Sequence, residues 1–155
     1  MATVNQTTLD KLLNLAASWQ VVNIKVHQYH YNISSSNFRS LHALFKELYE
    51  DADERYDEVA ERLRQIGQKV VLSCADLARR SAVSDDNSVA TPEAMLQGVV
   101  DSFAAITTLQ TEIWFESDEQ KDMVTNDLMV QLNKYIDLKN WMVTAQMGKE
   151  VVQTK

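Results

Sequence analysis

The stretch VHQYHYNISSSNFRSLHALFKELYEDADERYDEVAERL, residues 26–63, predicts the fold of this chain and holds most of its candidate chemistry. It contains all three histidines, His27, His30 and His42, and the densest cluster of acidic residues. Residues 34–37 read SSSN, a composition typical of turns, so the stretch predicts two antiparallel helices joined at that point. In such a hairpin, His30 and His42 lie a few residues on either side of the turn, and their imidazoles sit at a similar height.

Two carboxylates of the same stretch, Asp57 and Glu61, are four residues apart and therefore share one face of the second helix. The fifteen steps from His42 to Asp57 leave the two side chains roughly 60° apart around the helix axis, but about 22 Å apart along it. One metal ion cannot be held by ligands at that separation. If these residues form a metal site, the histidines come from one chain and the carboxylates from another, so the spacing predicts an assembly.

The composition predicts one helical domain. The chain has 155 residues, 45% hydrophobic and 24% charged, with three glycines and one proline. This length allows a sizeable core, and scarce glycine and proline favour long helices over a sheet with many turns. The net charge of −7 argues against a general nucleic-acid binder, because affinity for phosphates comes largely from Lys and Arg. An acidic surface either attracts cations or simply keeps the protein soluble.

The sequence also predicts a cytoplasmic location. Cys74 is the only cysteine, so no disulfide forms within the chain, and we expect a buried, inert thiol in a reducing compartment. The first ten residues, MATVNQTTLD, lack the charged and apolar regions of a secretory signal. No apolar run approaches the length that crosses a bilayer, so no membrane partner is expected.

Apolar residues on alternating three- and four-residue steps predict four long helices and a short one. Their spans are residues 8–33, 37–66, 73–81 (short), 92–116 and 118–147, within a single domain of residues 1–155. Each long helix has a candidate capping or starting signal: Thr7 with Asp10, Ser36 or Asn37, Thr91 with Pro92 and Glu93, and Ser117 with Gln120. Residues 68–90 form a connection too long for a plain up-down bundle, and this predicts an all-α, ferritin-like four-helix bundle with a long crossover between its second and third long helices.

Imidazoles and carboxylates together suit Fe(II), Zn(II) or Mn(II). Each residue also has a plainer interpretation, because a histidine can be a packed, hydrogen-bonded side chain and an acid can belong to a solvated helix face. A di-iron centre inside one bundle requires Glu-x-x-His pairs, and no glutamate here is followed three residues later by histidine. That kind of centre is excluded. There is also no glycine-framed serine elbow and no phosphate-binding glycine loop.

The pattern H-Y-N…NF-x-x-LH-x-LF-x-x-LY…D-E-V-A-E-R, from His30 to Arg62, closely resembles the signature of the Dps mini-ferritin family. The four-helix layout, the short central helix and the NWM of residues 140–142 extend the resemblance over nearly the whole chain. The resemblance implies a hollow homododecamer built from two-fold dimers, with a ferroxidase centre at the interface of paired subunits.

Within that centre, the resemblance implies that His30 and His42 of one subunit meet Asp57 and Glu61 of its partner. Glu61 matches the carboxylate that bridges the irons or lies closest to the iron. Fe(II) is then oxidised, preferably by hydrogen peroxide and otherwise by O2, and the ferric product is stored as mineral inside the shell, which protects against oxidative damage. Zinc in the place of iron is the alternative metal.

The acids Asp118, Asp122 and Asp127 fall at the expected start of the last long helix. They resemble the negatively charged three-fold pores through which iron enters shells of this family. An equally good interpretation is that they complement the helix dipole and form a solvated face.

The chain departs from the family pattern at several positions. Tyr31 stands where the family has tryptophan, and Lys46 stands where an acid often follows the second histidine. A cation at that position would repel a second Fe(II), which leaves one or two irons per centre open. Residues 1–8 contain no Lys or Arg, and the other end offers only Lys149 and Lys155, so DNA binding through a basic tail is not expected.

Two alternative functions remain at this point. The first is a Dps-like cage with weak or absent ferroxidase activity, which Lys46 favours. The second is a protein that binds and protects DNA, against which the missing basic tail counts.

Overall fold

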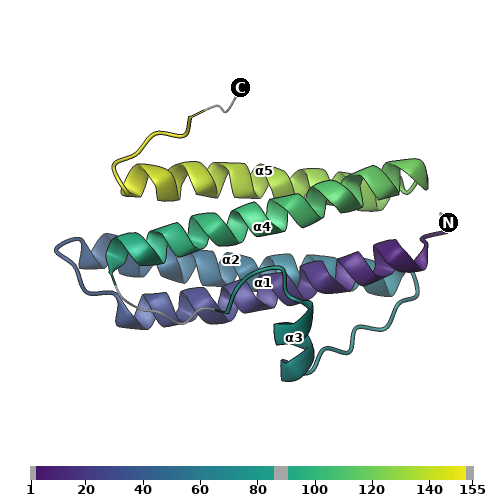
Figure 1. The fold of residues 1–155 in the computed structure, drawn as a ribbon, viewed down its shortest axis with the longest axis horizontal. Helices are drawn as coiled ribbons and strands as arrows, with labels where there is room; N and C mark the ends of the chain where they lie inside the picture. The colour runs from purple at the N-terminus through teal and green to yellow at the C-terminus, as the bar shows by residue number, and fades with distance from the viewer. Residues whose placement is uncertain (1–2, 86–90, 153–155) are drawn as a thin grey trace.

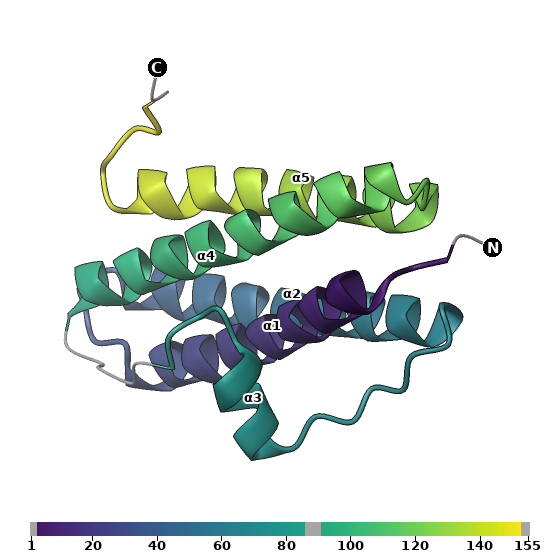
Figure 2. The same ribbon diagram turned by 45° about the vertical axis from the view of Figure 1, so that its right-hand side comes forward.

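The structure, a computed structural model, describes residues 3–85 and 91–152. In those residues the chain forms five helices and no strand: α1 (Gln6–Asn32), α2 (Phe38–Gln65), α3 (Cys74–Arg80), α4 (Pro92–Glu119) and α5 (Met123–Gln146). The four long helices lie side by side, and the short α3 projects from the side of the bundle next to α1 (Figures 1 and 2). The prediction of an all-α four-helix bundle is therefore confirmed.

The long crossover determines the direction of the helices. The chain leaves the end of α2, passes through α3 and returns to the other end of the bundle, so α4 runs in the same direction as α2 (Figure 1). Helix α1 packs against α2, α3 and α4, and α5 packs against α4. Residues 86–90 of the predicted crossover lie outside the described residues, as does Lys155.

The core is apolar along the length of the bundle. Its largest fully buried side chains include Trp19, Phe45 and Phe103, one from each of α1, α2 and α4. Burying side chains of this size is the main source of stability in a helical bundle, at about 25 cal/mol per Å² of apolar surface removed from water. No helix among the described residues is both long enough and apolar enough to cross a bilayer.

The start of α1 differs from the prediction. Its cap is Asn5, whose side chain accepts a hydrogen bond from the Thr8 backbone nitrogen at 2.9 Å. The predicted box of Thr7 with Asp10 is therefore wrong, because the helix has already begun at Gln6.

The break between the last two helices also differs from the prediction. Helix α4 continues through Ser117 to Glu119, and α5 begins only after Asp122. The turn is made at Lys121, whose φ of 58° lies in the left-handed region. Gln120 makes no capping box with Ser117, because its side-chain amide nitrogen donates to the Thr8 hydroxyl at 2.8 Å and ties the turn to the start of α1.

The single cysteine is not buried. Cys74 is the first residue of α3 and its side chain is exposed. The seven-residue α3 buries none of its residues, and it begins with a capping box between Ser73 and Asp76. The expectation of a buried thiol is therefore wrong, because this short helix lies on the surface.

Candidate metal centre

The end of α1 and the start of α2 bring two imidazoles into contact, at the height that the hairpin predicts. The rings of His30 and His42 are stacked, with centroids 3.7 Å apart and planes 19° apart. The His30 Nδ1 donates to the His42 backbone oxygen at 2.7 Å, and the His42 Nδ1 donates to the His30 backbone oxygen at 2.9 Å. Each Nδ1 therefore carries the proton, and in the neutral imidazoles each Nε2 keeps a lone pair for a metal ion.

Aromatic side chains fix this pair from the sides. Phe38 stacks on His42 at 4.9 Å between centroids, and the edge of Tyr49 meets His30 at 5.4 Å. His27 in turn stacks on Tyr49 at 3.6 Å. His30 is only 8% exposed and His42 is half-buried, so the pair is packed on one side and accessible on the other.

The two carboxylates lie elsewhere on the same helix. Asp57 and Glu61 are exposed on α2, one turn apart. They border a surface hollow of about 590 Å³. Its lining residues are Tyr56, Asp57, Ala60, Glu61, Arg64, Gln65 and Val70.

The structure brings together the members of each pair, but it does not bring the two pairs together. Along α2, the fifteen-residue rise from His42 to Asp57 corresponds to about 22 Å. Within the described part of the chain, no three His, Cys, Asp or Glu side chains are grouped so that they could hold a metal ion. A site that uses both pairs therefore requires a second chain.

Asp122 is a structural residue in this chain. It caps α5, is 3% exposed, and accepts two hydrogen bonds from the Arg62 guanidinium at 2.7 and 2.9 Å. Burial alone would raise the pKa of Asp122, but the hydrogen bonds from Thr125 and Arg62 outweigh it and hold the pKa below its usual value. Its carboxylate is thus already paired within the chain.

The three candidate pore acids are consequently not alike. Asp118 lies exposed in the last turn of α4, whereas Asp127 lies exposed in α5, and Asp122 is buried between them. The expectation that all three stand at the start of one helix is wrong, because the break between the helices comes later than predicted. A pore role for Asp118 and Asp127 stays a prediction.

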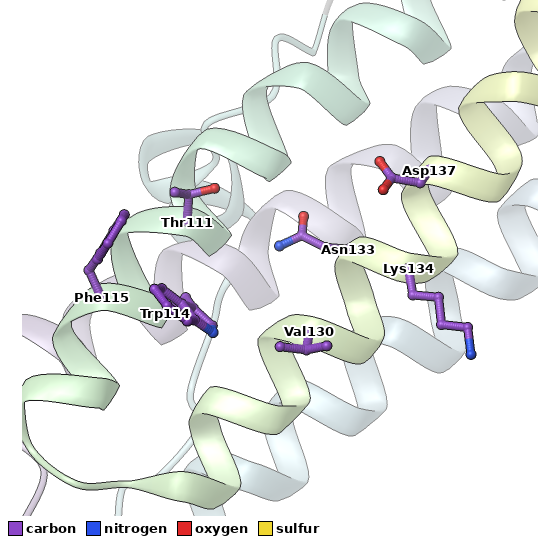
Figure 3. A pocket seen from close by; sticks show the side chains of 7 residues that line it. All are labelled: Thr111, Trp114, Phe115, Val130, Asn133, Lys134 and Asp137. Carbon is purple, nitrogen blue, oxygen red and sulfur yellow. The ribbon is translucent and has the colours of Figure 1, made fainter.

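A second hollow of similar size, about 580 Å³, lies between α4 and α5. Figure 3 shows the side chains that line it: Thr111, Trp114, Phe115, Val130, Asn133, Lys134 and Asp137. Asp137 is its only carboxylate and Lys134 is a cation, so this hollow lacks the ligand set of a metal site.

Known proteins resemble the whole chain. A family model for the ferritin-like domain matches residues 9–150. The chain is 31% identical over 153 residues to the DNA protection during starvation (Dps) protein of Listeria monocytogenes, a match that covers 96% of this chain and 97% of that protein. The chain belongs to the Dps family of ferritin-like proteins.

Other Dps-like proteins agree with this assignment. General stress protein 20U of Bacillus subtilis is 30% identical over 132 residues, which cover 85% of this chain and 91% of that protein. The crystal structure of the Vibrio cholerae O1 Dps protein, described as a member of a broad superfamily of ferritin-like diiron-carboxylate proteins, matches with a TM-score of 0.88 at 28% identity. That match covers 95% of this chain and 98% of the Vibrio chain, and it confirms the ferritin-like fold.

The sequence did not reveal how the Dps histidines are held in place. The reciprocal hydrogen bonds use backbone oxygens, which leave no trace in residue identity. The spacing of residues in the sequence gave a weak indication of the contacts of His27 and Tyr49. His27 precedes His30 by one turn, and Tyr49 follows His42 by two turns on the same face. Those spacings favour contact but do not show which rings stack.

Proposed function

We propose that this protein oxidises Fe(II) and stores the ferric product. The observation that carries the proposal is the imidazole pair of His30 and His42, which is oriented through backbone oxygens so that both Nε2 atoms stay available. Within the described residues neither Nε2 has a hydrogen-bond partner, whereas buried polar atoms with a purely structural role are mostly hydrogen-bonded. Membership of the Dps family supports iron as the metal.

The centre lies between two chains in this proposal. A two-fold axis would place the histidine pair of one subunit against the hollow that holds the partner subunit's Asp57 and Glu61. Two-fold dimers are the commonest symmetric assemblies, and such an interface contains each contact twice, so a dimer would hold two identical centres. We infer that six such dimers close into a hollow shell, where the mineral is kept.

The chemistry follows from the ligands. Neutral imidazoles and carboxylates bind Fe(II), and the carboxylates stabilise the additional charge of Fe(III). Two Fe(II) ions, whether they are bound together or supplied one after the other, each give one electron to hydrogen peroxide, which takes up two protons and gives two water molecules and two Fe(III). We propose peroxide as the preferred oxidant, with O2 as the slower one. Zn(II) fits the same ligands but carries out no redox chemistry, so zinc would inhibit the centre.

The remaining features fit an iron store in the cytoplasm. Exposed acids such as Asp118 and Asp127 would attract Fe(II) toward openings in the shell. The net charge of −7 counts against DNA as a partner, because binding to the phosphate backbone depends on cationic side chains. The competing function is a shell with weak ferroxidase activity, and the position of Lys46 beside the histidine pair is the observation that favours it.

The proposal is tested by loading the protein with Fe(II) without oxygen, adding hydrogen peroxide, and following iron and protein together through size exclusion. Iron that elutes with a shell-sized particle is the expected result. The variants His30→Ala and Glu61→Ala should each slow iron oxidation by at least tenfold, because each removes one ligand. The matched control is Glu54→Ala, which removes another exposed carboxylate of α2 and should leave oxidation unchanged.

Two results would contradict the proposal. A shell-sized particle that carries no iron would show an assembly without ferroxidase function. A protein that remains a monomer has no interface and hence no complete centre.

A further inference from the structure

A cation stands beside the histidine pair. Lys46 follows His42 by one helical turn, so the two side chains share a face of α2 with their Cβ atoms about 5–6 Å apart. The Lys46 side chain is 56% exposed, and its Nζ lies 3.7 Å from a carboxylate oxygen of Glu50. Exposed pairs of this kind contribute little stability, so Glu50 holds the ammonium only weakly.

The opposite side of His42 is also cationic. Arg39 precedes His42 by three residues and is exposed on the same face of α2. The side chains in ring contact with the pair are Phe38, Tyr31 and Tyr49, none of which carries a carboxylate. Within one turn of His42 on its own helix, Arg39 and Lys46 thus bring positive charge, and the Glu50 carboxylate lies one turn further along.

The number of available ligands also limits how many ions the centre can hold. Two imidazoles from one subunit and two carboxylates from the partner provide four protein ligands, which is enough to hold one Fe(II). The position one turn after His42 is where α2 could offer a further oxygen ligand to a second ion on the histidine side. Lys46 stands there, and an ammonium group has three donors and no lone pair to offer a metal.

We propose that each centre binds a single Fe(II) and that Lys46 determines this number; the inference rests on the proposed ferroxidase function. At a separation of about 6 Å, comparable with the Cβ spacing of His42 and Lys46, a single positive charge weakens the binding of a divalent ion by about tenfold even at the dielectric constant of water. The effect grows where an interface excludes water. Lys46 thus both denies the second ion a ligand and repels it.

The test is a calorimetric titration of the assembled protein with Fe(II) in the absence of oxygen. The number of ions at the centre is the number that a protein with His30 binds minus the number that its His30→Ala variant binds. The unmodified protein should bind one Fe(II) per chain at the centre. Lys46→Glu, which supplies an oxygen ligand and reverses the charge, should bind two.

Two further variants separate charge from ligation. Lys46→Met removes the charge without adding an oxygen ligand, so it should still bind one Fe(II), about tenfold more tightly. Lys46→Arg keeps the charge and should behave as the unmodified protein does. The matched control is Lys149→Glu, which changes the net charge equally at an exposed site beyond α5.

Two Fe(II) per chain of similar affinity in the unmodified protein would overturn the inference while leaving the ferroxidase proposal intact. A single Fe(II) in Lys46→Glu would overturn the role of Lys46. An assembled shell that binds no Fe(II) at the centre would instead contradict the proposed function itself, so the two failures are distinguishable.

Discussion

The two imidazoles of the candidate centre orient each other through the main chain. Each Nδ1 of His30 and His42 is bound to the backbone oxygen of the other residue, so neither ring turns freely. A ligand that is already oriented loses little conformational entropy on binding. The sequence predicted that the two histidines lie at a similar height, and their stacked rings confirm this. It did not predict the two hydrogen bonds that hold the rings. Their acceptors are backbone oxygens, and their formation depends on the distance between the two helices.

A second residue-scale feature is the buried pair of Arg62 and Asp122. The Arg62 side chain is 11% exposed, and removing its partner would leave a charge with little access to water. We expect Asp122→Asn to lower the free energy of unfolding by about 3 kcal/mol, the lower end of the cost of breaking a buried ion pair. Thermal unfolding followed by circular dichroism measures this. Asp127→Asn, an exposed acid of the same helix, should have little effect.

The pH dependence of this pair has a definite sign. The folded pKa of Asp122 lies below its unfolded value, so its contribution to stability is complete above the unfolded pKa of about 4 and is lost as pH falls through the folded pKa. The difference in stability between the unmodified protein and Asp122→Asn should therefore shrink at acid pH. A difference that stays constant from neutral pH to about pH 2 would contradict this assignment.

At the scale of the helices, a second polar cluster connects α2 and α5. Lys139 of α5 is 8% exposed, and its Nζ bonds to Glu47 and lies 3.2 Å from an oxygen of Asp51, both on α2. The Tyr135 hydroxyl donates to Asp51 at 3.0 Å. Burial and the neighbouring Asp51 carboxylate both raise the pKa of Tyr135, so its hydroxyl stays a donor.

We expect substitutions in this cluster to loosen the contact between the two helices. Lys139→Met leaves Asp51 with a single partner, and should cost about 1–3 kcal/mol of unfolding free energy. Tyr135→Phe removes one hydrogen bond and keeps the ring contacts with Trp19 and Phe103, so about 1 kcal/mol is expected. Urea unfolding of both variants tests the order. A larger loss in Tyr135→Phe than in Lys139→Met would show that Lys139 is not the main connection.

Periodicity predicted the long helices well because each one buries an apolar stripe. It failed at the break between α4 and α5, where Ser117 and Gln120 have the identities of a capping box but bind other partners. Just after that break, Asp122 pairs with Arg62 of α2, a residue far away in sequence. Local patterns cannot show such contacts. The predicted histidine and carboxylate pairs needed only local spacing, and the distance between them needed only the rise of a helix.

At the scale of the whole molecule, the proposed centre makes a quantitative prediction about mixed assemblies. One variant carries His30→Ala and His42→Ala, and the other carries Asp57→Ala and Glu61→Ala. Each alone should be inactive. After they are unfolded together and reassembled, half of the dimers combine both variants and each holds one intact centre, so about a quarter of the original ferroxidase activity should return.

The control for this experiment is simple mixing of the two variants after assembly, which should restore nothing while subunits do not exchange. A centre formed within one chain would give no recovery on co-assembly. Any activity near a quarter therefore assigns the ligands to different chains.

The separation of the two ligand pairs by about 22 Å along α2 has a consequence for newly made chains. A single folded chain carries the histidine pair at one place and the carboxylate pair at another, so it has no complete centre. On the proposed function, iron chemistry begins only when two chains have found each other in the correct orientation. Ferric iron would then form only on paired chains, which are the units that build the shell, and a single chain would form none.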